Sequence, residues 1–283
     1  RGLPVLLDVG SASPADRFGP GLQFGHVVGD ALDEQVLLIK IAWGGKNLAV
    51  DFRPPSAGGE RGPYYDEIFT HTKAVLDELE THFPKAKGMR PKIAGLIWFQ
   101  GWNDRLNQVH NDEYGSNLAH LIRDVRAEFE LPKLPFVIGE TGQGGPDEKH
   151  PRALSLMRHQ ADVAALKEFK GTVRLARTTH CYADEPRHEG GYHFFGNAAN
   201  FFGIGQIGKL EPISHRRVGR NRLVTQVERD AVIGWPADDA RQQQGGRREL
   251  KIGKYTAVAN IVEHACPRTT LDGRIINRRI DGE

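Results

Sequence analysis

The segment Leu96-Ile-Trp-Phe-Gln-Gly-Trp-Asn-Asp104 decides the fold class of this chain of 283 residues. The apolar run from Ile93 to Phe99 predicts a buried strand of a parallel sheet, and it stops abruptly at a Gln-Gly pair. In open α/β sheets, ligands bind just beyond the carboxyl ends of the strands. The glycine and amide side chains that follow this strand therefore place hydrogen-bond donors where an oxyanion is held. A turn with an Asn-Asp helix cap is the alternative structural explanation.

Two further segments have a similar character. Val36 to Ala42 is a β-branched, apolar strand candidate that runs into Trp43-Gly44-Gly45. Glycines at a strand end let a backbone N–H approach a ligand with no Cβ in the way, although a tight turn explains them equally well. Farther along, a glycine-flanked loop carries Gly190-Gly-Tyr-His193, and a predicted helix from 197 to 210 follows it.

The order of these three blocks resembles that of the SGNH/GDSL hydrolases. Within that superfamily, Gln100-Gly-x-x-Asp104 is similar to the sialate O-acetylesterase-like carbohydrate esterases. The resemblance covers roughly residues 15 to 210, including Phe18-Gly-Pro-Gly-Leu-Gln-Phe-Gly25. It implies hydrolysis of acyl esters, acetyl esters in particular, on a carbohydrate or polysaccharide substrate by a Ser-His mechanism that uses no cofactor and no metal. It also implies a periplasmic or extracellular location.

The alternation of predicted elements supports the same fold class. Strand and helix candidates follow one another at a spacing that predicts a parallel sheet with helices on both faces, the three-layer flavodoxin-like arrangement of SGNH proteins. The predicted strands are 3–9, 36–42, 93–99, 135–139 and 173–176, and the predicted helices are 21–33, 65–82, 112–130, 150–169 and 197–210.

The resemblance assigns roles to residues of this chain. His193 becomes the general base. Gly190 stands where the family has the Asp partner of this histidine, so Glu189, Asp184 and Glu185 are the nearby candidates for the carboxylate, with Glu189 preferred. The oxyanion donors are the backbone of Gly44 or Gly45 and the side chains of Gln100 and Asn103. Asp104 is expected to cap the next segment or to brace the loops. Trp43, Trp102 and Tyr192 offer flat surfaces for a sugar, although core packing explains all three equally well. Arg53 could pair with an acidic sugar, but a solvated loop arginine is the preferred explanation.

The nucleophile is the weakest part of the match. Neither Gly-Asp-Ser nor Gly-Gln-Ser-Asn occurs, and Gly-x-Ser-x-Gly is absent too. Ser11, which follows the possible strand Leu3 to Val9, is the candidate within the chain, ahead of Ser13. Because Phe18-Gly-Pro resembles a family segment that lies well after the nucleophile block, we expect the serine upstream of Arg1. On this expectation the chain is an inactive fragment of an esterase.

Composition separates two regions, residues 1–210 as the esterase domain and residues 211–283 as an irregular extension. The extension holds twelve Arg and two Lys together with ten acidic residues, and Lys251 to His264 is expected to form a strand or short hairpin. The net charge of the whole chain is +2, which gives no overall field for nucleic acid or a membrane surface. No apolar run approaches the roughly 20 residues that span a bilayer.

Other functions remain open at this point. A non-catalytic carbohydrate-binding relative would keep the same site without a nucleophile, and a flavodoxin-like nucleotide binder would share the fold. His180, Cys181, His188 and His193 lie within fourteen residues and have the chemistry of zinc ligands, but adjacent His and Cys chelate poorly.

Overall fold

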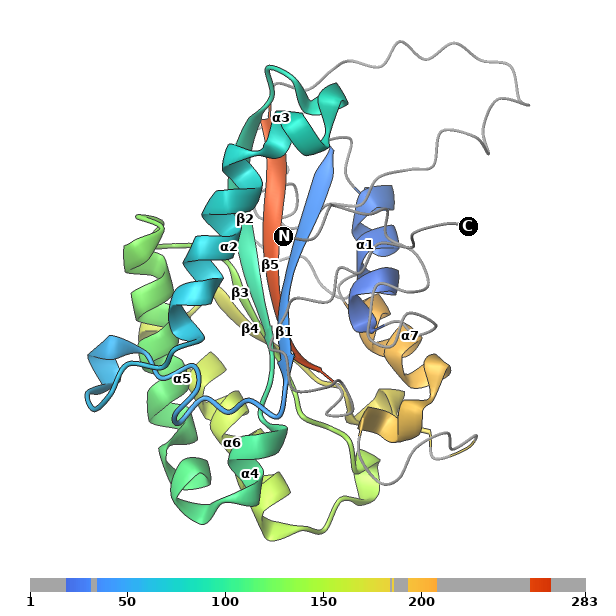
Figure 1. Cartoon of the computed structure of the whole chain (residues 1–283). Coiled ribbons are helices and arrows are strands. Elements are labelled where there is room, and N and C mark those ends of the chain that lie inside the picture. The colour runs from blue at the N-terminus through green and yellow to red at the C-terminus, as the bar shows by residue number, and fades with distance from the viewer. Residues whose placement is uncertain (1–18, 32–34, 184, 186–192, 208–254, 266–283) are drawn as a thin grey trace, which may run out of the picture.

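The computed structural model describes residues 19–31, 35–183, 185, 193–207 and 255–265. These residues form a five-stranded sheet in the order β1-β5-β2-β3-β4, and every neighbouring pair is parallel (Figure 1). All carboxyl ends therefore point toward the same edge of the sheet. The strands are β1 (Val36–Gly44), β2 (Arg90–Phe99), β3 (Phe136–Gly139), β4 (Val173–Ala176) and β5 (Tyr255–Ala265).

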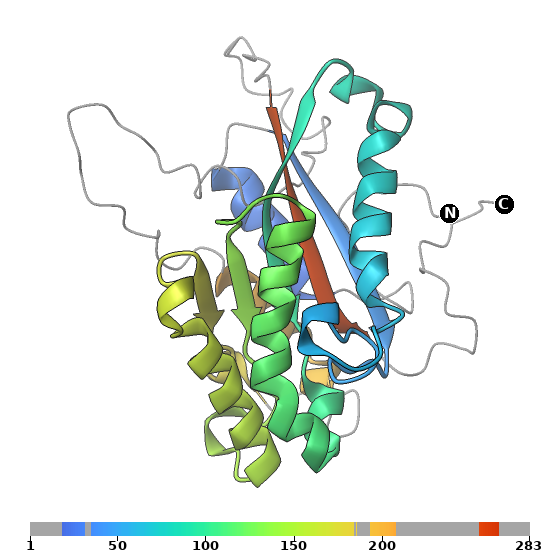
Figure 2. The same ribbon diagram turned by 90° about the vertical axis from the view of Figure 1, so that its left-hand side faces the viewer.

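Helices cover both faces of the sheet, which gives three layers. Helices α2, α5 and α6 lie against one face, and α1 and α7 pack together on the other, as the two views in Figures 1 and 2 agree. The described helices are α1 (Pro20–Ala31), α2 (Tyr65–Asp77), α3 (Leu79–His82), α4 (Trp102–Leu106), α5 (Gln108–Glu128), α6 (Pro151–Ala164) and α7 (Ala198–Gln206). This is the three-layer α/β arrangement that the sequence predicts.

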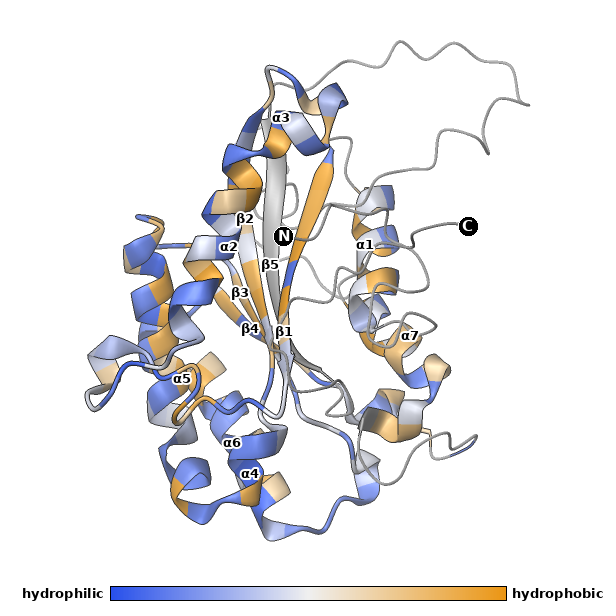
Figure 3. Cartoon of the chain, in the orientation of Figure 1, coloured by the Kyte–Doolittle hydropathy of each residue, from blue (hydrophilic) through white to orange (hydrophobic). Residues whose placement is uncertain are grey.

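The local sequence explains why the elements begin where they do. The side chain of Asn107 accepts hydrogen bonds from the backbone N–H of Val109 at 2.9 Å and of His110 at 3.3 Å, so it caps the N-terminus of α5. Apolar residues gather on β1 and on the sheet side of the helices, while the outward sides of α4, α5 and α6 are hydrophilic (Figure 3). The sheet thus buries its apolar residues beneath amphipathic helices.

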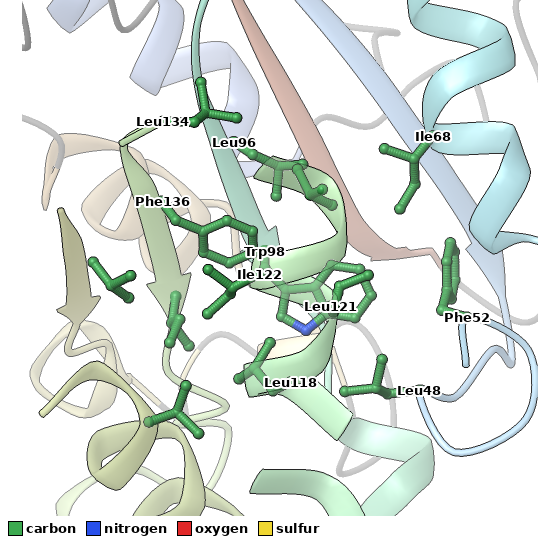
Figure 4. Close-up of a cluster of buried hydrophobic side chains, with 14 of the residues drawn as sticks. Leu48, Phe52, Ile68, Leu96, Trp98, Leu118, Leu121, Ile122, Leu134 and Phe136 are labelled. Atoms are coloured by element: carbon green, nitrogen blue, oxygen red, sulfur yellow. The ribbon is translucent and has the colours of Figure 1, made fainter. Parts of the chain in front are cut away.

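The largest buried cluster lies between the sheet and α5. Trp98 of β2 is fully buried at its centre, and its indole N–H donates to the hydroxyl of Tyr114 at 3.2 Å. The ring of Phe52 meets Trp98 edge to face, with 5.4 Å between the ring centroids. Around this pair pack Leu48, Ile68, Leu96, Leu118, Leu121, Ile122, Leu134 and Phe136 (Figure 4).

Some element bounds differ from the sequence prediction for local reasons. The expected helix 65–82 breaks at Glu78, whose φ of −99° and ψ of 12° separate α2 from α3. The expected helix 150–169 ends at Ala164, because Leu166 turns to an extended ψ of 136° and a short 3₁₀ turn then buries Phe169 in the core. The predicted helix 112–130 begins earlier, at Gln108. The possible strand at residues 3–9 lies outside the described residues.

The strand expected near residues 251–264 is present as β5, in the middle of the sheet. It pairs with β1 on one side and with β2 on the other, and Ala259 is in register with both Leu38 and Gly95. A hairpin would make antiparallel pairs, so the strand alternative is confirmed for residues 255–265. Through β5, the ends of β1 and β2 lie two strand spacings apart, roughly 10 Å.

Candidate functional site

The loops after β1 and β2 meet at the carboxyl edge of the sheet. Gly44 at the end of β1 is in register with Ala265, and Phe99 at the end of β2 is in register with Glu263. Both Gly-Gly and Gln-Gly therefore leave the sheet at nearly the same level. The sequence prediction that these two segments meet at one site is consistent with this register.

Asp104 joins the two loops. Its carboxylate is fully buried and accepts the backbone N–H of Leu48 at 2.9 Å and of Ala49 at 3.0 Å. It also accepts the side-chain amide of Gln100 at 2.6 Å. One carboxylate in the first turn of α4 thus holds the segment after β1 in place. The expectation that Asp104 braces the loops is confirmed.

Burial determines the acidity of Asp104. Desolvation raises the pKa of this carboxyl from 3.8 to about 6, and the hydrogen bonds from Gln100, Leu48 and Ala49 oppose that rise without cancelling it. The nearby His110 also opposes the rise electrostatically, but less than these hydrogen bonds do. The group is therefore a structural carboxylate that titrates unusually close to neutral pH.

Gln100 has less freedom than its predicted role requires. Its Nε2 donates to the carbonyl of Lys46 at 3.1 Å and to Asp104 at 2.6 Å, so both amide protons are engaged within the loops. Because both neighbours are acceptors, the amide cannot be turned around to free its N–H groups. Its Oε1 is buried and has no partner within the described part of the chain. This geometry favours Gln100 as a brace rather than as an oxyanion donor.

Gly45 and Asn103 lie next to each other. Gly45 has a φ of +73°, and a Cβ placed on it would be 3.7 Å from the side-chain nitrogen of Asn103. A left-handed conformation at this point turns the chain sharply after β1 and is readily adopted only by glycine. The backbone of Gly45 and the side-chain amide of Asn103 are therefore neighbours at the carboxyl edge of the sheet.

A buried polar network behind these loops was not anticipated from the sequence. Gln160 of α6 is fully buried, and its Nε2 donates to the carbonyls of Gln100 at 3.2 Å and of Gly139 at 3.3 Å. Its Oε1 accepts the backbone N–H of Thr141 at 3.0 Å. Gln160 thereby fixes the ends of β2 and β3 to each other. A lone glutamine on the buried side of an amphipathic helix is the only signal that the sequence offers for it.

The backbone after His193 is unusual. His193 begins a short turn in which Phe194 and Phe195 have φ values of 50° and 56°, and Gly196 follows at 65°. Left-handed conformations cost non-glycine residues roughly 1–2 kcal/mol each, so packing must offset the strain. The buried ring of Phe194 stacks on Phe99 with 6.3 Å between centroids. This contact places the backbone of His193 near the end of β2.

Phe99 reaches that position because Gly139 leaves room for it. A Cβ on Gly139 would lie 2.3 Å from the Phe99 ring. Successive side chains of a strand point to opposite faces, so Trp98 packs toward α5 and Phe99 toward Phe194 in the turn before α7. The end of β2 therefore supports the site from both sides of the sheet.

The remaining predicted site residues are less closely assembled. The ring of Trp43 packs on Tyr64 at 4.7 Å and on Phe52 at 6.1 Å between centroids, which favours the core alternative. Arg53 forms an ion pair of 2.7 Å with Glu113 and donates to the carbonyl of Gly58, so it ties a loop together. Ser11, Glu189 and Tyr192 lie outside the described residues.

Trp102 forms a second cluster at the beginning of α4. The guanidinium of Arg105 lies 3.6 Å from the centre of the Trp102 ring, and Arg105 approaches Glu148 at 3.9 Å. Burial lowers the pKa of Arg105, and the nearby Glu148 carboxylate opposes that effect. Trp102 is half-buried and keeps the sugar-stacking role as a prediction.

The described residues give no support to a metal centre. His180 and Cys181 lie 3.5 Å apart through Nε2 and Sγ, but no group of three or more potential ligands occurs in the part of the chain described by the structure. His188 lies outside that part.

Glu140 was not singled out from the sequence. It is a buried carboxylate at the end of β3 that accepts the backbone N–H of Thr178 at 2.9 Å and pairs with Arg177 at 3.1 Å.

The fold and the strand-end loops define a three-layer α/β protein of the SGNH type. Comparison with known families is in agreement, because the family model described as "Carbohydrate esterase, sialic acid-specific acetylesterase" matches residues 3–198. This chain belongs to that family of carbohydrate esterases. The resemblance stated from the three sequence blocks is thereby confirmed.

A curated relative is known from Arabidopsis thaliana. The protein named "Probable carbohydrate esterase" is 25% identical over 134 residues, which are 45% of this chain and 43% of the relative. The match thus covers less than half the length of either protein. No solved structure matches the chain. Among the helices described by the structure, none has both the length and the apolar character needed to cross a membrane.

Proposed function

We propose that this protein hydrolyses acyl esters, acetyl esters in particular, on a carbohydrate. The observation that carries the proposal is the convergence of Gly45 and Asn103 at the sheet edge, within a chain that belongs to the carbohydrate esterase family. Two neighbouring hydrogen-bond donors suit an oxyanion that develops during acyl transfer. The acetyl group and the sugar are supported by the family description.

The proposed reaction follows the serine–histidine pattern. A serine oxygen attacks the ester carbonyl while His193 removes its proton, and the negative charge on the carbonyl oxygen is held by the N–H of Gly45 and the amide of Asn103. His193 then returns the proton to the departing sugar hydroxyl. Water hydrolyses the acyl-enzyme by the same steps. Ser11 is the candidate nucleophile within this chain, and Glu189 is the candidate partner that orients the imidazole.

The structure refines the division of labour among the predicted oxyanion donors. The two N–H groups of Gln100 are engaged by Lys46 and Asp104. We therefore assign Gln100 and Asp104 to the support of the loop, and Gly45 and Asn103 to the oxyanion. Because Trp43 packs on Tyr64 and Phe52, we assign the stacking on a sugar ring to Trp102 among the described residues.

Fluorophosphonate labelling with peptide mass mapping tests this proposal. A covalent adduct on Ser11 that is lost in a Ser11→Ala variant and retained in a Ser13→Ala variant, together with release of acetate from an O-acetylated sugar, would identify Ser11 as the nucleophile and overturn the expectation of a serine upstream of Arg1. An adduct on another serine would replace Ser11 as the nucleophile. Absence of both adduct and acetate release would refute hydrolysis by this chain. Sugar binding would then have to be tested in its place.

A further inference from the structure

The loop that follows β1 closes on itself, because the backbone N–H of Gly62 donates to the carbonyl of Arg53 at 2.9 Å. Inside this closed loop, the short 3₁₀ turn Pro55–Ala57 lies against α5 (Figures 1 and 2). Ser56, in the middle of the turn, is exposed. Compact loops whose ends meet hold their side chains in defined positions. The loop therefore presents a serine hydroxyl on the surface of the protein.

Ser56 is hydrogen-bonded to a histidine of α5. Its Oγ lies 2.7 Å from Nδ1 of His120. The hydroxyl donates this bond when Nδ1 carries no proton. A neutral imidazole at this distance can accept the hydroxyl proton while the oxygen attacks an electrophile. The pair thus has the arrangement of a nucleophile and its general base.

Asp124 completes the cluster. Its Oδ2 accepts the backbone N–H of Ser56 at 3.0 Å. His120 and Asp124 are four residues apart on α5, so they lie on the same side of the helix. A nearby negative charge stabilises the imidazolium that forms when His120 takes the proton. Asp124 therefore holds the serine in place and favours the proton transfer.

The backbone of the turn limits which esters can react here. The N–H of Ser56 is engaged by Asp124, and those of the next two residues donate to carbonyls within the turn, at 3.1 Å each. These three N–H groups therefore cannot hold the negative charge of a tetrahedral intermediate. An alkyl acetate, whose alkoxide leaves poorly, is then a poor acyl donor. An aryl ester reacts more readily, because a phenolate is a much better leaving group.

We propose that Ser56 is a second nucleophilic centre, which takes the acyl group from activated aryl esters with His120 as its base. The Oγ of Ser56 bonds to the acyl carbon, its proton passes to His120, the bond to the aryl oxygen breaks, and the phenolate leaves with that proton as a phenol. The product is an alkyl ester of serine. Because the turn offers it no oxyanion donor, this ester is hydrolysed slowly and the acyl group accumulates on the chain. The centre goes beyond the proposed function and uses none of its residues.

Acetylation of the full chain by para-nitrophenyl acetate, followed in time by peptide mass mapping, tests the centre. Ser155 of α6 is the internal comparison, because its Oγ lies 3.5 Å from Nε2 of His159, too far for efficient proton transfer. A positioned general base contributes roughly 10²–10⁴ in rate, so we expect Ser56 to be acetylated on the order of 10² faster than Ser155.

Two variants of α5 decide whether His120 acts as a base. His120→Asn keeps a hydrogen-bond acceptor for Ser56 but cannot take its proton, so acetylation of Ser56 should fall by about 10². His159→Asn is the matched control and should leave that rate unchanged. Asp124→Asn keeps an acceptor for the N–H of Ser56 but removes the charge, so it should slow acetylation less, and it serves if His120→Asn fails to fold. An unchanged Ser56 rate in whichever of these two α5 variants folds would overturn the centre, as would a rate equal to that of Ser155.

Ser56→Ala separates this centre from the proposed function. Release of acetate from an O-acetylated sugar should be unchanged in Ser56→Ala, and acetylation of Ser56 should be unchanged in Ser11→Ala. Loss of acetate release in Ser56→Ala would overturn a centre separate from the sugar esterase. If no variant releases acetate from the sugar while Ser56 is still acetylated through His120, the proposed function fails and the second centre stands.

Discussion

Replacement of Asp104 by Asn should change how the stability of this protein depends on pH. The carboxylate of Asp104 accepts three donors, from Leu48, Ala49 and Gln100. An Asn side chain offers one acceptor oxygen and turns an N–H toward donors that need an acceptor. At least one buried donor is then left unpaired, which costs roughly 1–3 kcal/mol.

The sign of the pH effect follows from the shifted pKa. Burial raises the pKa of Asp104 to about 6, above the 3.8 of an unburied aspartate. Between these values the folded state binds the proton more tightly than the unfolded chain does, so the free energy of unfolding rises as the pH falls from about 6 toward 4. A difference of about two pKa units corresponds to ~3 kcal/mol. The contribution of Asp104 to stability is therefore smallest above pH 6.

Urea unfolding between pH 4 and pH 8, followed by tryptophan fluorescence, measures this effect. The difference in unfolding free energy between wild type and Asp104→Asn should be larger at pH 4 than at pH 8, because only the wild type gains from protonation. Asn111→Ala, which removes a neutral buried side chain, should lower stability equally at every pH. The reasoning would be refuted if the unfolding free energies of wild type and Asp104→Asn changed in parallel with pH. It would also be refuted if the wild type became more stable relative to the variant as the pH rose from 4 to 6.

Three further substitutions test the loops at the sheet edge. Gly101→Ala places a Cβ 2.6 Å from the side chain of Leu156 at a φ of 154°, and thermal unfolding should show a loss of roughly 1–3 kcal/mol. Gln160→Leu leaves buried N–H and carbonyl groups unpaired, and denaturant titration should show a loss of roughly 2–4 kcal/mol. Asn103→Ala should lower kcat for acetate release by about 10²–10³, with little change in KM or thermal stability. The control Asn107→Ala should mainly lower thermal stability, because it removes the cap of α5.

The sequence predicted the strands and most of the helices because their signals are local. β1 and β2 are long apolar runs with glycine at or just after their ends, and α5 is a long amphipathic stretch, although its capping Asn107 was overlooked and its start was predicted too late. The break at Glu78 and the turn at Leu166 carry no comparable signal, since ordinary helix-forming residues occupy both positions. The place of β5 in the middle of the sheet depends on contacts with distant strands. No property of residues 255–265 alone specifies it.

The sequence pointed to the motifs that meet at the edge of the sheet, but not to the buried residues that support them. Gly45, Asn103 and Asp104 were recognised because glycines and amides at strand ends have a chemical reason to be there. Gln160 and Asn200 were missed because each acts on main-chain atoms of loops far away in the sequence. Such contacts become visible only when the chain is folded. Their detectable trace is a buried amide on an otherwise apolar helix face.

Three buried side chains, those of Asp104, Gln160 and Asn200, hold the loops through hydrogen bonds. Whether two of them share a bonding partner predicts whether the effects of their substitutions add. Asp104 and Gln160 both bind Gln100. Asp104 accepts the side-chain amide of Gln100, and Gln160 donates to the backbone carbonyl of Gln100. Asn200 holds Ala183 and Phe194 and shares no partner with Asp104. The losses of unfolding free energy caused by Asp104→Asn and by Asn200→Ala should therefore add, within about 0.3–0.5 kcal/mol, in the double variant. The losses caused by Asp104→Asn and Gln160→Leu should instead deviate from additivity by about 0.5 kcal/mol or more. The reverse pattern in a double-mutant cycle would mean that the His193 loop and the oxyanion loop form one cooperative unit. Additivity would mean instead that each half of the site is organised by its own side of the sheet.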